Sequence, residues 1–264
     1  MPKFDKKIVI NDSLSTGDRV VLCAAEFFGT GILVLLGCMG CVAGFTSTKY
    51  IPHEQISLTF GIAVMIGIQC FGHISGGHIN PAVTVAAAAL GTIPLIQVPI
   101  YFVGQFAGAI AGFGVLVAVT PSDYVKVNSS ELGVCSPAVN SAINQMQGFL
   151  VEFVATLVLI LACCAIWDKR NSDKHDSVTI RLGLTVAALA MAAGPYTGAN
   201  MNPARSFGPA LWNGDWRNDQ WVYWVGPLLA GLLGGLFYRI VFNKSDDPSN
   251  EPRPNEAIPL NDKA

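Results

Sequence analysis

The tripeptide Asn-Pro-Ala occurs twice in this sequence, at Asn80-Pro81-Ala82 and at Asn202-Pro203-Ala204. Asparagine is a favoured N-cap and proline is favoured at the first helical position, so each tripeptide predicts the start of a helix. The asparagine amide can cap its helix through oxygen and still offer N–H donors to another molecule. A helix start also carries about half a positive charge. Two such tips facing each other would pass neutral hydrogen-bonding molecules and repel cations and protons.

Arg205 follows the second tripeptide and is the only Lys or Arg between Arg181 and Arg217. An ionisable residue in apolar sequence indicates a functional site when the segment is buried in a membrane. We expect its guanidinium to donate hydrogen bonds to a passing solute and to repel cations. The alternative is a structural arginine that satisfies loop carbonyls.

Two acidic residues, Glu26 and Glu152, also lie within long apolar segments. One interpretation is a proton relay. The interpretation we favour is structural, because irregular backbone at membrane depth needs hydrogen-bond partners within the protein. Each carboxylate is expected to accept N–H bonds from one of the two loops that carry Asn-Pro-Ala.

The composition identifies an integral membrane protein. Hydrophobic residues make up 52% of the 264 residues and charged residues 13%, about half the share that is usual in soluble domains. No Lys, Arg, Asp or Glu occurs from Gln55 to Ser122. The formal charge of −2 provides no basic surface for nucleic acid, so we expect none as a partner.

Six apolar segments are long enough, or nearly so, to cross the hydrocarbon core of a bilayer, which needs about 20 helical residues. These segments are approximately 20–43, 56–72, 95–119, 147–167, 178–194 and 221–242. Two further apolar segments, 79–90 and 202–211, are too short, and both begin at an Asn-Pro-Ala. We expect Pro209 to end the second of them early.

The sequence contains an internal repeat. Asn80 and Asn202 are 122 positions apart, and so are Tyr101 and Tyr223 with the residues that follow them. Each half carries three spans and one short segment between its second and third spans. An odd number of spans per half inverts the second copy in the membrane, and inverted repeats with paired short segments indicate a substrate path at their interface. The fold class expected is therefore an all-α membrane protein with six transmembrane helices and two re-entrant half-helices in an inverted repeat.

This organisation divides the chain into three parts. Residues 1–17 form a cytoplasmic N-terminal segment, 18–243 the channel domain and 244–264 a polar, disordered cytoplasmic tail. Within the channel domain, repeat one covers about 18–120 and repeat two about 146–243. Lys and Arg are concentrated on the side of the two termini, which places both termini in the cytoplasm by the positive-inside rule. Asn128-Ser129-Ser130 is a glycosylation sequence on the opposite side.

The cysteines and histidines give no metal site. Cys38-Met39-Gly40-Cys41 has the CxxC form without a second pair to complete a zinc site, so we expect these cysteines to pack as small apolar residues. His73 and His78 are five residues apart with no carboxylate nearby. Glycines at four-residue spacing, such as Gly104, Gly108 and Gly112, are expected to let helices cross closely.

The segments from His73 to Ala82 and from Tyr196 to Ser206 resemble the two pore loops of the aquaporin (major intrinsic protein) family, and the resemblance extends over roughly residues 18–242. It implies an hourglass-shaped pore in each subunit of a homotetramer, in the plasma membrane and without a cofactor. It also implies that Glu26 and Glu152 support the loops. By the same analogy His78 lies at the cytoplasmic pore wall, and His73 lies beside the loop as a pH-sensitive gating element.

The resemblance also implies which residues form the narrow constriction of the pore: Phe60, Ala190, Ala199 and Arg205. Strict water channels usually have histidine where this chain has Ala190. The smaller side chain widens the neck and leaves an apolar wall opposite one donor, which suits glycerol and small amides such as urea. Ser206 resembles water channels instead, since glycerol facilitators usually carry aspartate there. The combination resembles the insect entomoglyceroporins.

We therefore expect a passive channel for water and small uncharged solutes. The main alternative is a strictly water-selective aquaporin. A secondary transporter is disfavoured because the pore loops carry no carboxylate for a coupling ion, and a junctional membrane protein would show little flux. We identify no nucleophile and base that would make the protein an enzyme.

Overall fold

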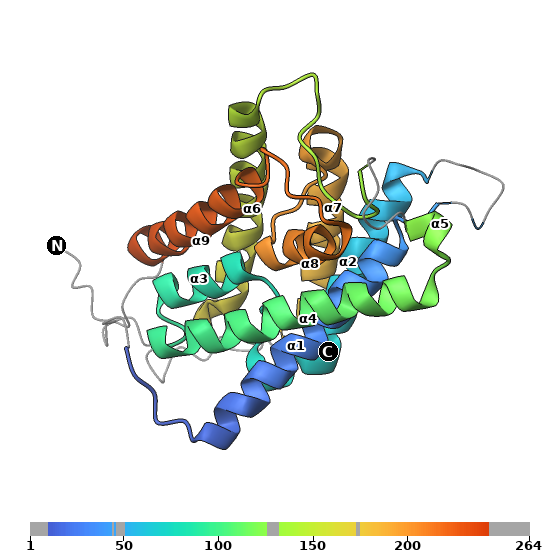
Figure 1. Ribbon diagram of the computed structural model, residues 1–264. Helices are drawn as coiled ribbons and strands as arrows, with labels where there is room; N and C mark the ends of the chain where they lie inside the picture. Colours follow the sequence, from blue (N-terminus) through green and yellow to red (C-terminus); the bar gives the residue numbers. More distant parts are fainter. Residues whose placement is uncertain (1–9, 44, 46–50, 126–131, 173–174, 243–264) are drawn as a thin grey trace, which may run out of the picture.

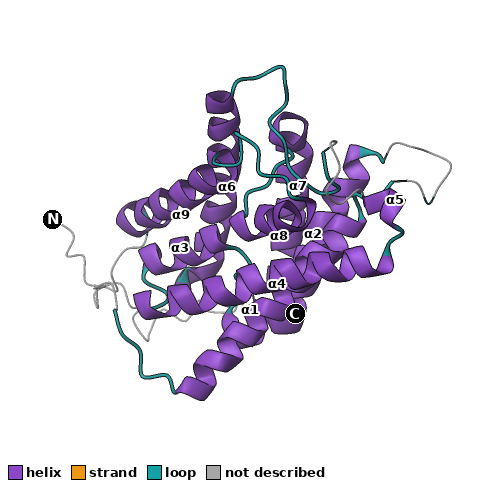
Figure 2. Ribbon diagram, in the orientation of Figure 1, coloured by secondary structure: helices purple, strands orange, loops and turns teal. Residues whose placement is uncertain are grey.

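The computed structural model describes residues 10–43, 45, 51–125, 132–172 and 175–242. Six long helices are apolar enough to cross a membrane, and the described part of the chain contains no strand (Figures 1 and 2). Their bounds are α1 Thr16–Met39, α2 His53–Ser75, α4 Val98–Val119, α6 Gln145–Trp167, α7 Val178–Thr197 and α9 Val222–Val241. The shorter helices are α3 Pro81–Leu90, α5 Ser122–Val125 and α8 Pro203–Asn213. Three 3₁₀ turns cover Leu95–Gln97, Lys169–Asn171 and His175–Ser177. The predicted all-α fold with six apolar spans and additional short helices is confirmed.

The first span of each repeat starts with the same kind of cap. The Ser15 hydroxyl accepts a hydrogen bond from the backbone N–H of Asp18, and the Asp18 carboxylate accepts one from the backbone N–H of Ser15. Asn144 and Gln147 make the same reciprocal pair at the start of α6. Such capping boxes satisfy N–H groups that have no partner within the helix. Both starts are therefore encoded locally, within four residues.

The helices of the two repeats pack in matching pairs. In the first repeat α1 packs on α4 and α2, and in the second α6 packs on α9 and α7. The two halves meet where α2 packs on α7. The short helices are exchanged, since α3 packs mainly on α9 and α8 mainly on α4. Figure 1 shows α3 between α9 and α4, among the longer helices. Each half-helix is therefore held by the last span of the opposite repeat.

Close crossing of α1 and α4 depends on the glycine row. A Cβ atom on Gly104 would lie 2.4 Å from the Cys23 carbonyl oxygen, and one on Gly108 would lie 2.2 Å from that of Phe27. No larger residue fits at these distances. In the second repeat, a Cβ on Gly226 would lie 3.1 Å from that of Glu152. The glycines bring α4 and α9 close to the spans that carry the two buried glutamates.

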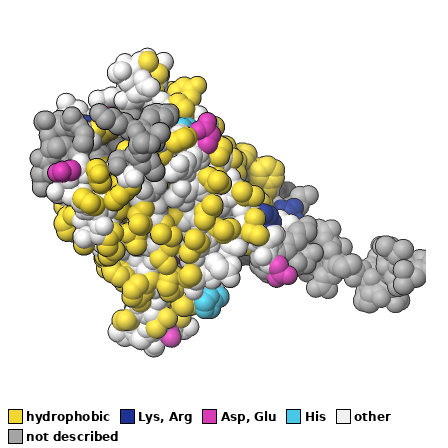
Figure 3. Space-filling view, turned by 90° about the vertical axis from the view of Figure 1, so that its right-hand side faces the viewer, with side chains coloured by type: hydrophobic (Ala, Val, Ile, Leu, Met, Phe, Trp, Pro, Cys, Tyr) yellow, Lys and Arg dark blue, Asp and Glu magenta, His cyan; other side chains and the backbone are white. Residues whose placement is uncertain are grey.

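Apolar side chains cover the outside of the bundle. Many large hydrophobic residues are exposed on the spans, including Val103, Leu184 and Phe237. Figure 3 shows apolar side chains over most of one face, with the few charged ones in view toward its edges. A surface of this kind is expected to face lipid or further copies of the chain.

Residues before α1 fold back onto the start of α4. Asp12 accepts hydrogen bonds from Gln97 at 2.9 Å and from Arg19 at 2.7 Å, and the Ile96 N–H donates to the Ile10 carbonyl. These hydrogen bonds from Gln97 and Arg19 lower the pKa of the Asp12 carboxyl. Asp12 therefore ties the N-terminal segment to α4 in its ionised form.

One expected helix end is wrong. Pro209 lies inside α8, which continues to Asn213 and ends at Gly214 with a φ of 67°. Proline removes one backbone hydrogen bond from the helix. Gly208, however, packs closely against the backbone of α4, since a Cβ atom on Gly208 would lie 2.6 Å from the Ala109 carbonyl oxygen. Packing along α4 therefore outweighs the local preference to stop. The predicted glycosylation sequence at Asn128 and the tail 244–264 lie outside the described residues.

Candidate functional site

The two Asn-Pro-Ala tips contact each other in the middle of the molecule. The Asn80 amide donates to the Met201 carbonyl at 2.9 Å, and the Asn202 amide donates to the Ile79 carbonyl at 2.9 Å. Each asparagine oxygen caps its own helix, accepting from the Ala82 N–H at 2.9 Å in α3 and from the Ala204 N–H at 3.0 Å in α8. Since an amide has two N–H donors, each asparagine keeps one for another molecule.

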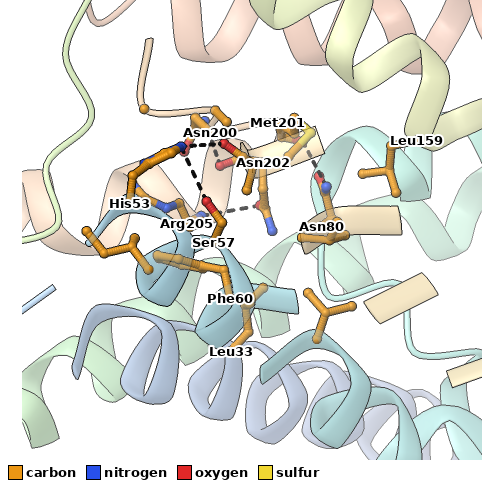
Figure 4. Close-up of a pocket in the computed structure, with 16 residues that line it drawn as sticks. Leu33, His53, Ser57, Phe60, Asn80, Leu159, Asn200, Met201, Asn202 and Arg205 are labelled. Carbon is orange, nitrogen blue, oxygen red and sulfur yellow. Dashed lines mark hydrogen bonds between the residues drawn. The ribbon is translucent and has the colours of Figure 1, made fainter. Parts of the chain in front are cut away.

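Two cavities meet at these asparagines. They have volumes of about 60 and 70 Å³ and share six lining residues, namely Leu33, Val64, Asn80, Leu159, Val186 and Asn202. One cavity, shown in Figure 4, extends to Arg205, and the other extends to His78. A water needs ~10–15 Å³ of such volume, so each cavity has room for several. Together the two cavities form one path through the molecule, with an Arg205 end and a His78 end.

The loops that carry the tips contain strained residues at matching positions. Ile79 has a φ of 44° and Met201 a φ of 51°, values that are rare for residues other than glycine. Such a conformation costs about 1–3 kcal/mol and persists only where the surroundings hold it. Here the N–H of each residue donates to a buried glutamate, and its carbonyl accepts the asparagine of the opposite repeat. The unusual φ angles of Ile79 and Met201 therefore orient both carbonyls toward the point where the two Asn-Pro-Ala tips meet.

Glu26 holds the first loop from α1. It accepts hydrogen bonds from the Ser75 hydroxyl at 2.6 Å, from the His78 N–H at 3.0 Å and from the Ile79 N–H at 2.7 Å. The Gln105 amide donates to it at 2.7 Å from α4. The side chain is fully buried, with both oxygens bonded.

Glu152 does the same for the second loop from α6. It accepts from the Thr197 hydroxyl at 2.6 Å and from the N–H groups of Asn200 and Met201 at 2.8 Å each. It is also fully buried. In α9, Tyr223 adds a further bond from its hydroxyl to the Thr197 carbonyl at 3.0 Å. This arrangement uses Glu152 as an acceptor that orders irregular backbone.

Phe60, Ala190, Ala199 and Arg205 all line the cavity at the Arg205 end. The Arg205 guanidinium carbon lies 4.7 Å from the Phe60 ring centroid, a geometry in which ring and cation attract. One of its nitrogens, Nη1, donates to the Cys135 carbonyl at 2.8 Å. The planar group is thus held from two sides while it borders the path.

His78 and His73 have different surroundings. His78 is buried, lines the cavity at its end, and its Nδ1 lies 3.2 Å from the Thr84 hydroxyl. Its ring contacts Tyr101 and Trp167, with centroids 4.7 and 5.5 Å away. His73 is exposed on the last turn of α2 and is not among the residues that line the two cavities. Among the described residues, no three His, Cys, Asp or Glu side chains are grouped to hold a metal ion.

The expectation that Cys38 packs only as a small apolar residue is wrong, because it forms a disulfide with Cys135. Cys38 lies near the end of α1, and Cys135 belongs to the segment between α5 and α6 whose carbonyl holds Arg205. The two cysteines are 97 positions apart, and seven cysteines allow many pairings, so sequence spacing did not indicate this pair. The disulfide fixes the segment that covers the Arg205 end.

Cys135→Ser is expected to lower stability by ~2–4 kcal/mol, the usual contribution of a native disulfide. The thermal unfolding midpoint of the purified protein in detergent measures this, with Cys70→Ser as the control, since Cys70 is an exposed free thiol. Equal midpoints for the two variants would contradict a structural role for the bond.

Sequence reasoning missed several residues that contact the site. Gln105 donates to both Glu26 and Thr84 at the centre of the first repeat. The Tyr101 hydroxyl donates to the Ser75 carbonyl at 2.6 Å, as Tyr223 does for Thr197. The repeated tyrosine, 122 positions apart, was a signal for this pair. Nothing in the sequence pattern pointed to His53, which also lines the cavity at the Arg205 end.

Comparison with known proteins agrees with this geometry. The sequence model of the Major intrinsic protein family matches residues 13–238. The chain is 42% identical to mouse (Mus musculus) aquaporin-4 over 221 residues, or 83% of this chain and 66% of that protein, so it spans about two thirds of the length of this relative. It is 39% identical to the human (Homo sapiens) lens fiber major intrinsic protein, over 81% of this chain and 78% of that protein.

A solved structure shares the fold. The aquaglyceroporin from Plasmodium falciparum superposes with a TM-score of 0.72 at 24% identity, covering 88% of this chain and 98% of that one. The paired tips, the inverted repeat and the match over residues 13–238 lead to one conclusion: this chain belongs to the major intrinsic protein (aquaporin) family.

Proposed function

We infer that this aquaporin-family channel conducts water together with glycerol and urea, and excludes ions and protons. A water molecule at the crossing point can accept hydrogen bonds from the free N–H donors of Asn80 and Asn202. Its own hydrogens then point away along the path, which disfavours a continuous proton wire. The converging starts of α3 and α8 raise the energy of a cation at the same place. Arg205 adds a second positive barrier at its end of the path.

The observation that supports glycerol and urea conduction is the small side chain of Ala190 at the neck. Ala190 lines the same cavity as Phe60 and Arg205, so its methyl group leaves space that an imidazole would occupy. The neck then has an apolar side and a hydrogen-bonding side, which matches a polyol or a small amide. The combination of Ala190 with Ser206 supports the proposal that the chain is an entomoglyceroporin-like channel.

Ala190→His is expected to lower glycerol and urea permeability by about tenfold or more, the range by which a pocket excludes a solute that no longer fits, while water permeability is retained. Stopped-flow swelling of proteoliposomes in glycerol, urea and osmotic gradients measures all three. Ala190→Ser is the matched control, since it adds one hydroxyl and keeps the neck wide. Glycerol flux that is absent in the wild type, or unchanged by histidine, would contradict this selectivity. Negligible water flux in folded wild-type protein would favour a junctional role instead.

Strict selectivity for water is the second candidate. It is favoured by Ser206, a residue typical of water channels, which is fully buried. Its hydroxyl donates to the Pro203 carbonyl at 3.0 Å, and the Asn200 amide lies 3.3 Å from it. The swelling experiment decides between the two, because a strict water channel shows no glycerol or urea flux in the wild type.

We place the Arg205 end outside the cell and both termini in the cytoplasm of a plasma-membrane protein. Two observations support this orientation. Lys and Arg are more frequent on the side of the termini, and the Cys38–Cys135 disulfide lies at the opposite end, where an oxidising compartment would maintain it. Protease accessibility of an N-terminal tag in intact and permeabilised cells tests the assignment.

A homotetramer is proposed as the assembled form. It is supported by the exposed apolar residues of the spans, which a neighbouring copy could cover as well as lipid does. Chemical cross-linking in native membranes, followed by denaturing electrophoresis, measures the number of subunits.

A further inference from the structure

We propose that His53 is a further selectivity-determining residue, which supplies from α2 an imidazole at the neck where α7 carries only Ala190. This inference rests on the proposed function above, because it concerns the same neck. It adds a wall residue that the four constriction positions do not include.

The first support is the position of His53 on α2. His53, Ser57, Phe60 and Val64 follow at spacings of four, three and four residues, so they share one face of the helix. All four line the cavity that extends to Arg205. Figure 4 shows His53, Ser57 and Phe60 together on the side of α2 that faces Arg205 and Asn202. His53 is the first residue of the helix and is partly exposed, so it lies at the mouth of the path.

The second support is the contact with α7. The Nε2 atom of His53 lies 3.0 Å from the Ala190 carbonyl oxygen and 3.4 Å from the Ser57 hydroxyl. The ring therefore lies beside the backbone of Ala190, whose own side chain is only a methyl group. A proton on Nε2 donates to this carbonyl, which leaves Nδ1 as an acceptor.

The third support is the space that α7 provides. A Cβ atom on Gly194 would lie 2.0 Å from Cε1 and 2.4 Å from Nε2 of the His53 ring. The imidazole thus occupies a recess that exists because residue 194 is glycine. Gly194 and Ala190 are one turn apart, so two small residues of α7 together accommodate one ring from α2.

These contacts define what the ring does to a solute. The imidazole narrows the mouth of the cavity that it shares with Arg205, and it adds a polar group beside the apolar side chain of Ala190. A narrower mouth restricts glycerol and urea more than water, because they are larger. His53 therefore limits the permeability to glycerol and urea that the small side chain of Ala190 would otherwise allow.

The test is the glycerol-to-water permeability ratio of proteoliposomes that contain His53→Ala. We expect the ratio to rise about fivefold, because removing the ring lowers the steric barrier to the larger solute by ~1 kcal/mol, with water permeability retained. His53→Gln keeps a polar side chain of similar reach and is expected to restore most of the wild-type ratio. Gln55→Ala is the matched control, since Gln55 is exposed on the same helical turn and does not line the cavity.

A ratio that stays within twofold of wild type in His53→Ala would overturn the proposal, and so would loss of water flux in that variant. A second measurement uses His53→Cys and a membrane-impermeant thiol reagent. Block of water flux is expected in this variant, but not in Gln55→Cys or the wild type, and failure to block would also overturn it. If the wild type conducts no glycerol, the proposed solute range is wrong. The His53 proposal is then tested separately, because it still predicts that His53→Ala admits glycerol.

Discussion

Glu152→Ala is expected to remove most of the folded, water-conducting protein. The substitution leaves three donors without their acceptor: the Thr197 hydroxyl and the N–H groups of Asn200 and Met201. A buried donor without a partner costs about 1–3 kcal/mol, so the expected destabilisation is at least ~3 kcal/mol. The loss falls on a loop in which Met201 already has an unfavourable φ. Thermal unfolding in detergent and water flux per unit of reconstituted protein measure the effect.

Glu54→Ala is the control for this experiment, because Glu54 is an exposed glutamate on the first turn of α2. Substitutions at such surface positions usually change stability by less than about 0.5 kcal/mol. Glu152→Gln is expected to have intermediate stability and water flux. Its amide oxygen can still accept hydrogen bonds, but its amide nitrogen replaces the second acceptor and cannot accept from the donor that it faces. Normal stability and flux in Glu152→Ala would refute the supporting role of this carboxylate.

The second large effect concerns charge selectivity. Arg205→Val is expected to raise cation or proton leak by roughly 100-fold, with water flux maintained. A monovalent cation about 5 Å from the guanidinium experiences a repulsion of ~3 kcal/mol at an effective dielectric constant of about 20, which corresponds to roughly that factor. Proteoliposomes that contain a pH-sensitive dye, or that hold a potassium gradient, report the leak.

Arg205→Lys separates charge from shape. Lysine keeps the positive charge but loses the planar group that stacks on Phe60 and donates to the Cys135 carbonyl. We expect a low leak in this variant and an altered glycerol rate. If Arg205→Val conducts water and leaks no more than the wild type, the barrier must arise elsewhere, at the tips of α3 and α8.

Much of the architecture could be predicted because its causes are local. The six spans follow from apolar length, and the starts of α3 and α8 follow from asparagine and proline at the cap and first helical positions. The repeat adds a constraint that single segments lack, since it relates the surroundings of Asn80 to those of Asn202. Glu26 and Glu152 could be assigned a supporting function because a carboxylate at membrane depth needs donors, and a re-entrant loop has them.

Features that depend on distant packing could not be predicted from the sequence. Pro209 should end a helix on local grounds, but packing of Gly208 on α4 carries α8 four residues further. The disulfide joins Cys38 to a loop residue 97 positions away, and no periodicity specifies such a pair. His53 is separated from Ala190 by 137 positions, and only the recess at Gly194 shows where its ring lies.

The exchange of half-helices between repeats has a consequence for biosynthesis. Pro81–Leu90 packs on Val222–Val241, which leaves the ribosome long after it. The Asn80 amide likewise lacks its carbonyl partner until Met201 has been made. A nascent chain that holds only the first repeat can insert its spans but cannot close its first pore loop. Pore formation is therefore a late event that requires both halves, and truncations within the second half should leave the first without a conducting path.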